Sequence, residues 1–151
     1  MHRLLKAALV AAVALSTLQA QAPTSSPLLS KRLEFRHGVT LELAENAGGG
    51  LRVDTVEFRM PAIGKDGYLS RTAGLLTASV AVSNTSDVAR GVGLAIALHD
   101  DAGRLLGVAS GGNKLTPIKP GRQKTFTLIF DGVNHEAHRA TRFEISVEPK
   151  R

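Results

Sequence analysis

Apolar and polar residues alternate through most of this chain, and a period of two is typical of β-strands with one buried face. The clearest example lies near the end of the sequence, where Phe143, Ile145 and Val147 alternate with charged and hydroxyl side chains. A helix would instead place its apolar residues three or four positions apart. The pattern therefore predicts a chain that folds almost entirely from strands.

Five further segments repeat the alternation, and each gives a row of side chains that we expect to point inward. A step from odd to even positions in one row predicts a β-bulge near Asp54 or Thr55. Turns are expected at 45–50 and 100–103, and Pro149 is expected to end the last strand. The rows are Val39, Leu41 and Leu43; Leu51, Val53, Val56, Phe58 and Met60; Ala78, Val80 and Val82; Val92, Leu94, Ile96 and Leu98; and Phe126, Leu128 and Phe130. Leu105, Leu106 and Val108 are expected to form a return strand after the turn at 100–103.

Strands of this kind must bury their apolar faces against one another. Only 134–140 resembles a helical turn, so we predict an all-β fold, an immunoglobulin-like antiparallel β-sandwich of seven to eight strands. The Cys and Trp residues that mark antibody-type domains are missing from the sequence. On the second face of the 92–98 row, Gly93, Ala95 and Ala97 are small, so another group can pack closely over them.

Residues 1–22 have the parts of a secretory signal peptide. Arg3 and Lys6 supply positive charge, 7–18 form an apolar core, and 20–22 offer small residues for cleavage. The alternative, an uncleaved membrane anchor, needs about 20 apolar residues, and this run is shorter. We expect an exported protein, periplasmic or secreted, with no stable membrane insertion after cleavage.

The rest of the chain is expected to form one domain. Residues 23–32 hold prolines and serines and are predicted to be a flexible lead-in, followed by a single β-sandwich domain at 33–151. Because the sequence contains no Cys, burial alone must stabilise this fold. The same absence excludes thiol catalysis, a zinc site built on thiolates and a lipid anchor on cysteine.

Charge and aromatic content argue against nucleic acid and sugar as partners. The chain has 19 Lys and Arg against 13 Asp and Glu, and loss of Arg3 and Lys6 would leave an excess of four positive charges. Nucleic-acid binding favours clustered cations with interleaved aromatic residues, whereas these cations are scattered along the sequence. Only Phe35 and Tyr68 are expected as exposed aromatic platforms for a sugar ring.

Enzyme motifs are not found in the sequence. Ser110 lies within Gly107-Val108-Ala109-Ser110-Gly111, which lacks the Gly-x-Ser-x-Gly pattern of hydrolases. The glycines at 48–50 are not followed by the Lys and Ser or Thr of a phosphate-binding loop. We therefore expect a protein that is not an enzyme and needs no cofactor.

Two groups of residues were weighed as metal ligands. His135 and His138 are three residues apart and follow Asp131, so both imidazoles could face one ion on a helical turn, although no third ligand is identified. Asp100 and Asp101 stand close to a glycine, but a calcium loop needs about six oxygen ligands. We expect Asp100 to accept hydrogen bonds from backbone amides of its own turn, and we predict no metal site.

The longest irregular stretch, 61–74, is a candidate contact surface. Lys65, Tyr68 and Arg71 would form its tip if the loop binds a partner, and an ordinary loop without function is the alternative. The turn at 84–86 matches the acceptor pattern for N-glycosylation, and the sequence leaves open whether it is modified.

The segment 75–147 resembles a known bacterial domain. It has an Asn-containing turn at 84–86, the strand end Ile96-Ala97-Leu98-His99-Asp100, then Gly103, an aliphatic return strand and Pro120-Gly121. This order is similar to that of the FxLyD-type extracytoplasmic domain, in which aromatic residues occupy the positions of Ile96 and His99. The resemblance implies an immunoglobulin-like module of exported or envelope proteins, with no shared catalytic residues.

Two functions from different classes remain. The first is a structural or interaction module that docks on another envelope or secreted protein, through a sheet edge or through the 61–74 loop. The second is a small-ligand or metal-ion carrier, with its cargo between the sheets or near His135 and His138. A polar-lined apolar pocket would favour the carrier, and an uninterrupted core with a long unprotected edge would favour docking. We predict docking.

Overall fold

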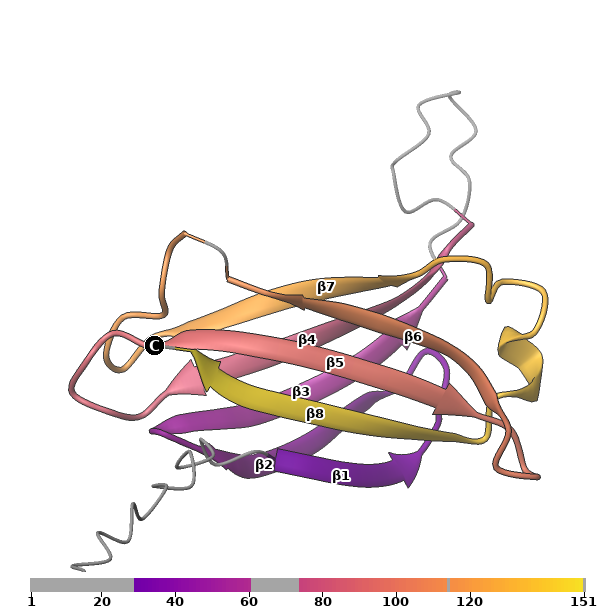
Figure 1. Cartoon of the computed structure of the whole chain (residues 1–151), viewed down its shortest axis with the longest axis horizontal. Coiled ribbons are helices and arrows are strands. Elements are labelled where there is room, and N and C mark those ends of the chain that lie inside the picture. The colour runs from indigo at the N-terminus through magenta and orange to yellow at the C-terminus, as the bar shows by residue number, and fades with distance from the viewer. Residues whose placement is uncertain (1–28, 61–73, 114, 151) are drawn as a thin grey trace, which may run out of the picture.

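The computed structural model describes residues 29–60, 74–113 and 115–150, and most of them lie in strands (Figure 1). The predicted signal peptide at 1–22 falls outside these residues. Within them, no helix has the length and apolar character needed to cross a membrane. The elements are β1 (Leu29–Glu34), β2 (Thr40–Gly48), β3 (Leu51–Arg59), β4 (Leu76–Asn84), β5 (Gly91–His99), β6 (Leu105–Gly112), β7 (Gln123–Phe130), the 3-10 helix η1 (Ala137–Arg139) and β8 (Arg142–Lys150).

The strands form two facing sheets of four strands each (Figure 1). Sheet A has the order β1-β8-β5-β6, and sheet B has the order β2-β3-β4-β7. Neighbouring strands are antiparallel throughout both sheets. The structure therefore confirms the predicted antiparallel β-sandwich, with eight strands.

The path of the chain between the sheets explains the likeness to an immunoglobulin domain. β4 and β7 are neighbours in sheet B, and β5 and β8 are neighbours in sheet A. In immunoglobulin domains, strands B and E are likewise neighbours in one sheet, and strands C and F are neighbours in the other. β1 pairs with the other side of β8, so the first strand of this domain occupies the place where an immunoglobulin domain has its last strand.

The core lies between the sheets and is built from the predicted inward rows. Phe58 of β3 stands near its centre, with ring centroids 4.9 Å from Phe143 of sheet A and 6.3 Å from Phe130 of sheet B. Full burial of an aromatic side chain of this size contributes roughly 2–3 kcal/mol. Phe35, which we expected to be exposed, instead lies 4.8 Å from the Phe58 ring and packs against the core.

β3 contains the predicted bulge, and β2 differs from its prediction. The register of β3 against β4 shifts between Val53 and Thr55, which confirms a bulge at this place. β2 continues to Gly48, although residues 45–50 were expected to form a turn. Two register shifts and a positive φ of 50° at Ala44 interrupt the alternation of side chains in β2. The strand predicted from that alternation therefore ends before the observed strand does. Val39, predicted to point inward, precedes the strand and is 44% exposed.

β1 was not predicted, because residues 29–32 were assigned to the lead-in. Its inward positions are Leu29, Lys31 and Leu33, so a lysine interrupts the apolar row. The Lys31 ammonium forms an ion pair with Glu45 of β2, across the side of the sandwich where the two sheets meet. Because Glu45 compensates its charge, Lys31 can occupy a half-buried inward position. The sequence pattern does not identify such a row as the apolar face of a strand.

β8 runs through Pro149, which we expected to end it. Pro149 stands opposite Val92 of β5, and the Val92 N–H and C=O both bond to Asn113 on the other side of β5. The missing N–H of Pro149 therefore does not face β5. It faces the β1 side, where the described part of β1 starts only at Leu29, opposite Val147. No sheet hydrogen bond is lost in this position.

Candidate functional site

The three residues weighed as metal ligands lie near one another in sequence, in the segment that contains η1. Asp131, His135 and His138 are all exposed around η1. Within the described residues, no three His, Asp or Glu side chains converge in the way that a metal ion requires. The predicted contact residues Lys65, Tyr68 and Arg71 lie outside the described residues.

Asp100 has the role predicted from its turn. Two arginines that the prediction missed also bind its carboxylate. Its side chain is buried, and it accepts a hydrogen bond from the Arg104 N–H at 2.8 Å. The same carboxylate accepts bonds at 3.1 Å from the guanidinium groups of Arg104 and Arg139. Two cations already compensate its charge, so Asp100 acts as a structural link between the β5–β6 turn and η1.

Asn84, at the end of β4, uses its complete hydrogen-bonding capacity inside the fold. Its amide donates to the carbonyl oxygens of Val88 at 2.7 Å and Ile118 at 2.8 Å. Its side-chain oxygen accepts bonds from the N–H and the hydroxyl of Ser86. Because the side chain is 1% exposed and both donors are in use, the folded domain leaves no room for a glycan on Asn84.

Asp54 connects three strands on the outer face of sheet B. Its carboxylate accepts hydrogen bonds from Arg52 of β3 at 2.7 Å, Ser83 of β4 at 2.5 Å and Gln123 of β7 at 2.8 Å. Burial raises the pKa of Asp54, but these three bonds and the Arg52 charge outweigh it, so the pKa lies below its ordinary value. The bulge between Val53 and Thr55 contains this carboxylate, which explains its position.

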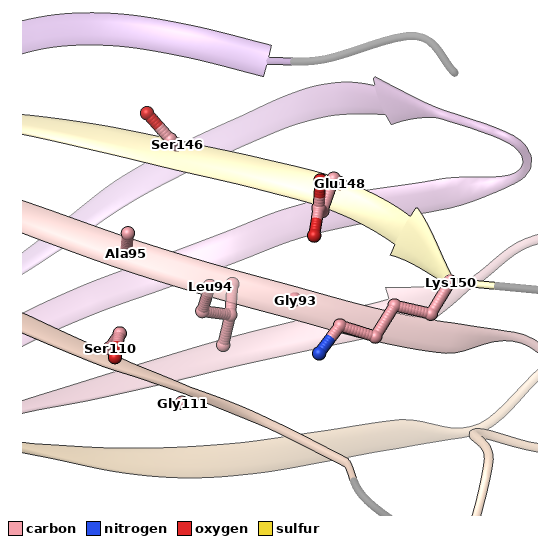
Figure 2. A pocket seen from close by; sticks show the side chains of 8 residues that line it. All are labelled: Gly93, Leu94, Ala95, Ser110, Gly111, Ser146, Glu148 and Lys150. Atoms are coloured by element: carbon pink, nitrogen blue, oxygen red, sulfur yellow. The ribbon is translucent and has the colours of Figure 1, made fainter. Parts of the chain in front are cut away.

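A shallow hollow of about 380 Å³ lies on the outer face of sheet A, over β8, β5 and β6 (Figure 2). Hydroxyl groups of Ser110 and Ser146 border it together with the Glu148 and Lys150 side chains. Figure 2 shows Lys150 extending from the end of β8 toward Gly93. These groups can donate and accept hydrogen bonds, but the hollow holds no histidine or second carboxylate that would make a catalytic pair.

The small residues of β5 explain the shape of this hollow. A Cβ atom on Gly93 would lie 2.8 Å from Glu148 Oε1 and 2.8 Å from Lys150 Cε, and one on Gly91 would lie 2.8 Å from Lys150 Cβ. Close packing over this face was predicted, and the groups that pack there include side chains of the neighbouring strand β8. The hollow is therefore partly filled by the domain itself.

His99 ends β5 on the same outer face. Its Nδ1 atom is buried and has no hydrogen-bond partner among the described residues. Arg142 of β8 stands opposite it in the register, and Leu105 of β6 stands opposite on the other side. One ring nitrogen without a partner does not make a binding site.

Each sheet has two edge strands, and three of the four are protected in familiar ways. β1 carries Lys31, Arg32 and Glu34. β2 carries Glu42 and Glu45 together with its two register shifts. β7 carries Lys124, which lies 5.6 Å from the centre of the Phe126 ring. Charges and bulges of this kind discourage another strand from pairing.

β6 is the fourth edge strand, and its sequence Leu-Leu-Gly-Val-Ala-Ser-Gly-Gly contains neither charge nor proline. Leu105 is 54% exposed and Val108 is 55% exposed. The only register shift against β5 lies at the hairpin end, beside Leu105. β6 pairs with β5 alone among the described strands, and none of them pairs with its other edge.

Two glycines let β6 lie close to β7 and to the segment that follows it. A Cβ atom on Gly107 would lie 2.2 Å from Val133 Cγ2, and one on Gly111 would lie 2.5 Å from Leu128 Cδ2. Because Gly107 and Gly111 occupy inward positions, Val108 lies on the outward face between them. The signal that could have identified this edge is the uncharged run from 105 to 112, which follows Arg104.

Comparisons with known proteins add no relative. No family model matches the chain, and no curated protein matches it significantly. The resemblance to FxLyD-type domains therefore stays a prediction.

Proposed function

We propose that this protein is a non-catalytic docking module that binds another protein along the β6 edge of sheet A. The observation that carries this proposal is an edge strand of eight residues without charge or proline. An extended segment of a partner could continue the sheet there, with main-chain hydrogen bonds for affinity and side-chain contacts for specificity. Leu105 and Val108 would supply the apolar contacts, since more than half of each side chain is exposed.

The packing between the sheets favours docking over the carrier. The facing inner rows of the two sheets form one continuous cluster of buried apolar side chains. The larger hollows among the described residues lie on the surface, and the hollow beside Lys150 is one of them. A carrier would instead need an apolar pocket with polar groups directed into it.

The expected location gives the class of partner. The signal peptide predicted at 1–22 directs the domain out of the cytoplasm, and the resemblance to FxLyD-type domains points to envelope or secreted proteins. The partner we propose is therefore a protein of the same compartment. The predicted contact tip at Lys65, Tyr68 and Arg71 stays a second candidate surface for the same role.

Affinity purification from the envelope fraction tests the proposal. Tagged wild-type chain is compared with Val108→Lys, which places a charge on the β6 edge, and with Thr127→Lys, a matched change at an exposed position of β7. We expect wild type and Thr127→Lys to retain the same protein, and Val108→Lys to retain about tenfold less, because edge charges oppose strand addition. Circular dichroism of each variant checks that it is folded.

Hydrogen exchange on the purified complex gives the location of the contact. Binding along the edge would slow exchange of amides in β6 (Leu105–Gly112) and leave those of β2 unchanged. Equal retention by Val108→Lys, or protection confined to another part of the domain, would show that β6 is not the docking edge.

A further inference from the structure

We propose that one end of the sandwich binds a membrane surface, where its cations contact anionic lipid headgroups and an exposed leucine enters the boundary of the acyl chains. At this end the β4–β5 and β6–β7 connections meet the end of β8 (Figure 1). We call it the basic end, made of 85–90, 115–124 and Lys150. The inference goes beyond the proposed function, because it concerns another surface and a partner that is not a protein.

The fold brings together two connections that are distant in the sequence. Arg90 and Ile118 form an antiparallel bridge, with N–H to C=O bonds of 3.0 and 2.8 Å. The Asn84 amide donates to the carbonyl oxygens of both Val88 and Ile118. Arg90 and Lys150 line one surface hollow of about 540 Å³ together with Leu115. Cations that are scattered along the sequence therefore become neighbours in the structure.

A tight turn adds two more cations beside the end of β4. Lys119 and Arg122 flank this turn, which the Arg122 N–H closes by donating to the Lys119 carbonyl at 3.1 Å. The Asn84 N–H donates to the Arg122 carbonyl, and the Gly121 N–H donates to the Asn84 carbonyl, both at 2.9 Å. Lys124 follows at the start of β7. The positions of these cations are thus fixed by main-chain bonds to β4.

The cations of the basic end are not compensated by described carboxylates. Elsewhere in the described residues most cations form ion pairs, as Arg59 does with Glu57. Those that form no ion pair with a described carboxylate are Arg90, Lys119, Arg122, Lys124, Arg142 and Lys150. All of these except Arg142 belong to the basic end.

Two acidic residues reduce the positive charge of this end without cancelling it. Asp87 lies in the β4–β5 connection and is exposed. Glu148 of β8 extends over Gly93, as Lys150 does (Figure 2). The cations outnumber these two acids, so the basic end attracts anions.

Apolar side chains stand exposed among the cations. Leu115 is 94% exposed in the β6–β7 connection, and Val88 is 47% exposed in the β4–β5 connection. An exposed apolar group beside cations fits the surface of an anionic bilayer, since headgroups attract the cations and the acyl boundary takes the apolar group. The leucine favours a bilayer over an acidic polysaccharide, which offers charge but no apolar medium. Such binding places the domain on the membrane and not through it.

Sedimentation with vesicles tests the role of charge. The chain is used as the cell exports it, and mass spectrometry checks that all variants have the same N-terminus. We expect binding to vesicles of equal parts phosphatidylglycerol and phosphatidylcholine, and little binding to phosphatidylcholine alone. Each Lys or Arg near an anionic surface contributes roughly fivefold in affinity, so Lys119→Gln combined with Arg122→Gln should bind about 25-fold less tightly.

Arg36→Gln combined with Arg142→Gln is the matched control. It removes two exposed cations at the opposite end of the sandwich, where Glu34 stands opposite Arg142 and Arg142 opposite His99. Charges act over only about 10 Å at 0.1 M salt, so we expect its affinity to stay within about threefold of wild type. Circular dichroism checks that both double variants are folded.

Tryptophan fluorescence tests where Leu115 goes. Since the chain contains no Trp, Leu115→Trp introduces a single indole. We expect its emission to shift to shorter wavelength with anionic vesicles, and the emission of Leu105→Trp, at the β5–β6 hairpin of the opposite end, to stay unchanged. Leu115→Ser should bind the vesicles at least about fourfold less tightly, which is the effect of one buried methylene group.

A chain that does not bind anionic vesicles at low salt would overturn the inference. Equal losses in the two double variants, or an unchanged emission of Leu115→Trp, would also overturn it. Binding to alginate that needs Lys119 and Arg122 but not Leu115, without binding to vesicles, would assign the basic end to an acidic polysaccharide instead. The proposed function is measured separately, since Val108→Lys should lose its protein partner and still bind vesicles.

Discussion

Arg139 donates a hydrogen bond of 3.1 Å to the buried carboxylate of Asp100, across 39 residues of sequence. The bond connects η1 with the turn between β5 and β6. It therefore fixes the hairpin from which the β6 edge extends. The resemblance to FxLyD-type domains draws attention to Asp100, and the structure gives a physical reason for an acid at this position.

Asp100→Asn is expected to lower the free energy of unfolding by about 2 kcal/mol, because bonds between a carboxylate and guanidinium groups are stronger than neutral ones. Urea unfolding at neutral pH measures the change. Asp101→Asn is the control, since Asp101 is exposed in the same turn and its change should stay within about 0.5 kcal/mol. Equal effects of the two substitutions would contradict the assigned role of Asp100.

Asp54 should make stability depend on pH in the acid range. Its pKa is lower in the folded domain than the ordinary value of 3.8, so the stability that it contributes is present above about pH 4. That contribution is lost as the pH falls through the folded pKa. We expect the difference in unfolding free energy between wild type and Asp54→Asn to shrink as the pH is lowered from 5 to 2 in urea titrations.

Glu144 provides the matched control for this titration. A hydrogen bond from Ser30 lowers its pKa, with burial opposing and Arg32 assisting, but the carboxylate is exposed to solvent. Solvent screens such pairs, so Glu144→Gln should change the acid dependence much less than Asp54→Asn. A larger effect at Glu144 would show that the surface pair, and not the Asp54 network, dominates acid unfolding.

Asn84→Ala is expected to destabilise the domain by about 2–3 kcal/mol, because the carbonyl of Ile118 loses its donor and the N–H and hydroxyl of Ser86 lose their acceptor. Thermal or urea unfolding measures this loss. Thr85→Ala is a nearby control, since Thr85 donates one side-chain bond to the Gly50 carbonyl at an exposed position. A cost at Asn84 no greater than at Thr85 would argue against the proposed anchor.

Gly107→Ala tests how closely β6 lies against the segment between β7 and η1. The new Cβ atom would lie 2.2 Å from Val133 Cγ2, and valine has little rotational freedom with which to move away. We expect a loss of about 1–3 kcal/mol, which is typical of overpacked cores. Ser110→Ala, at an exposed position of the same strand, should be close to neutral. A Gly107→Ala variant as stable as wild type would mean that β6 can shift outward.

The sequence predicted most strands because their inward rows are continuous. Phe126, Leu128 and Phe130, for example, give one clear face of β7, and the structure buries all three. β1 was missed for the opposite reason, since Lys31 interrupts its inward row. The charge of Lys31 is compensated by Glu45 of β2, and a local sequence pattern cannot show a contact between two strands.

The β6 edge could not be located from the sequence alone. Alternation shows that a strand exists at 105–112, but not whether it has one neighbour or two. That depends on the order of strands in the sheet, which contacts between distant residues decide. The exposure of Val108 follows from its place on the outward face of β6, between the inward Gly107 and Gly111. The links from Asp100 to Arg139 and from Asp54 to Gln123 were likewise hidden by separation in the sequence.

The pairing of β1 with β8 has a consequence for how the domain acquires its structure. Ser30 and Glu144, which are 114 residues apart, must meet before sheet A is complete. Contacts between such distant residues slow folding, because the chain loses the entropy of closing a long loop before the contact contributes any stability. A nascent chain cannot make this contact until Glu144 has left the ribosome, so sheet A stays incomplete until β8 has been synthesised.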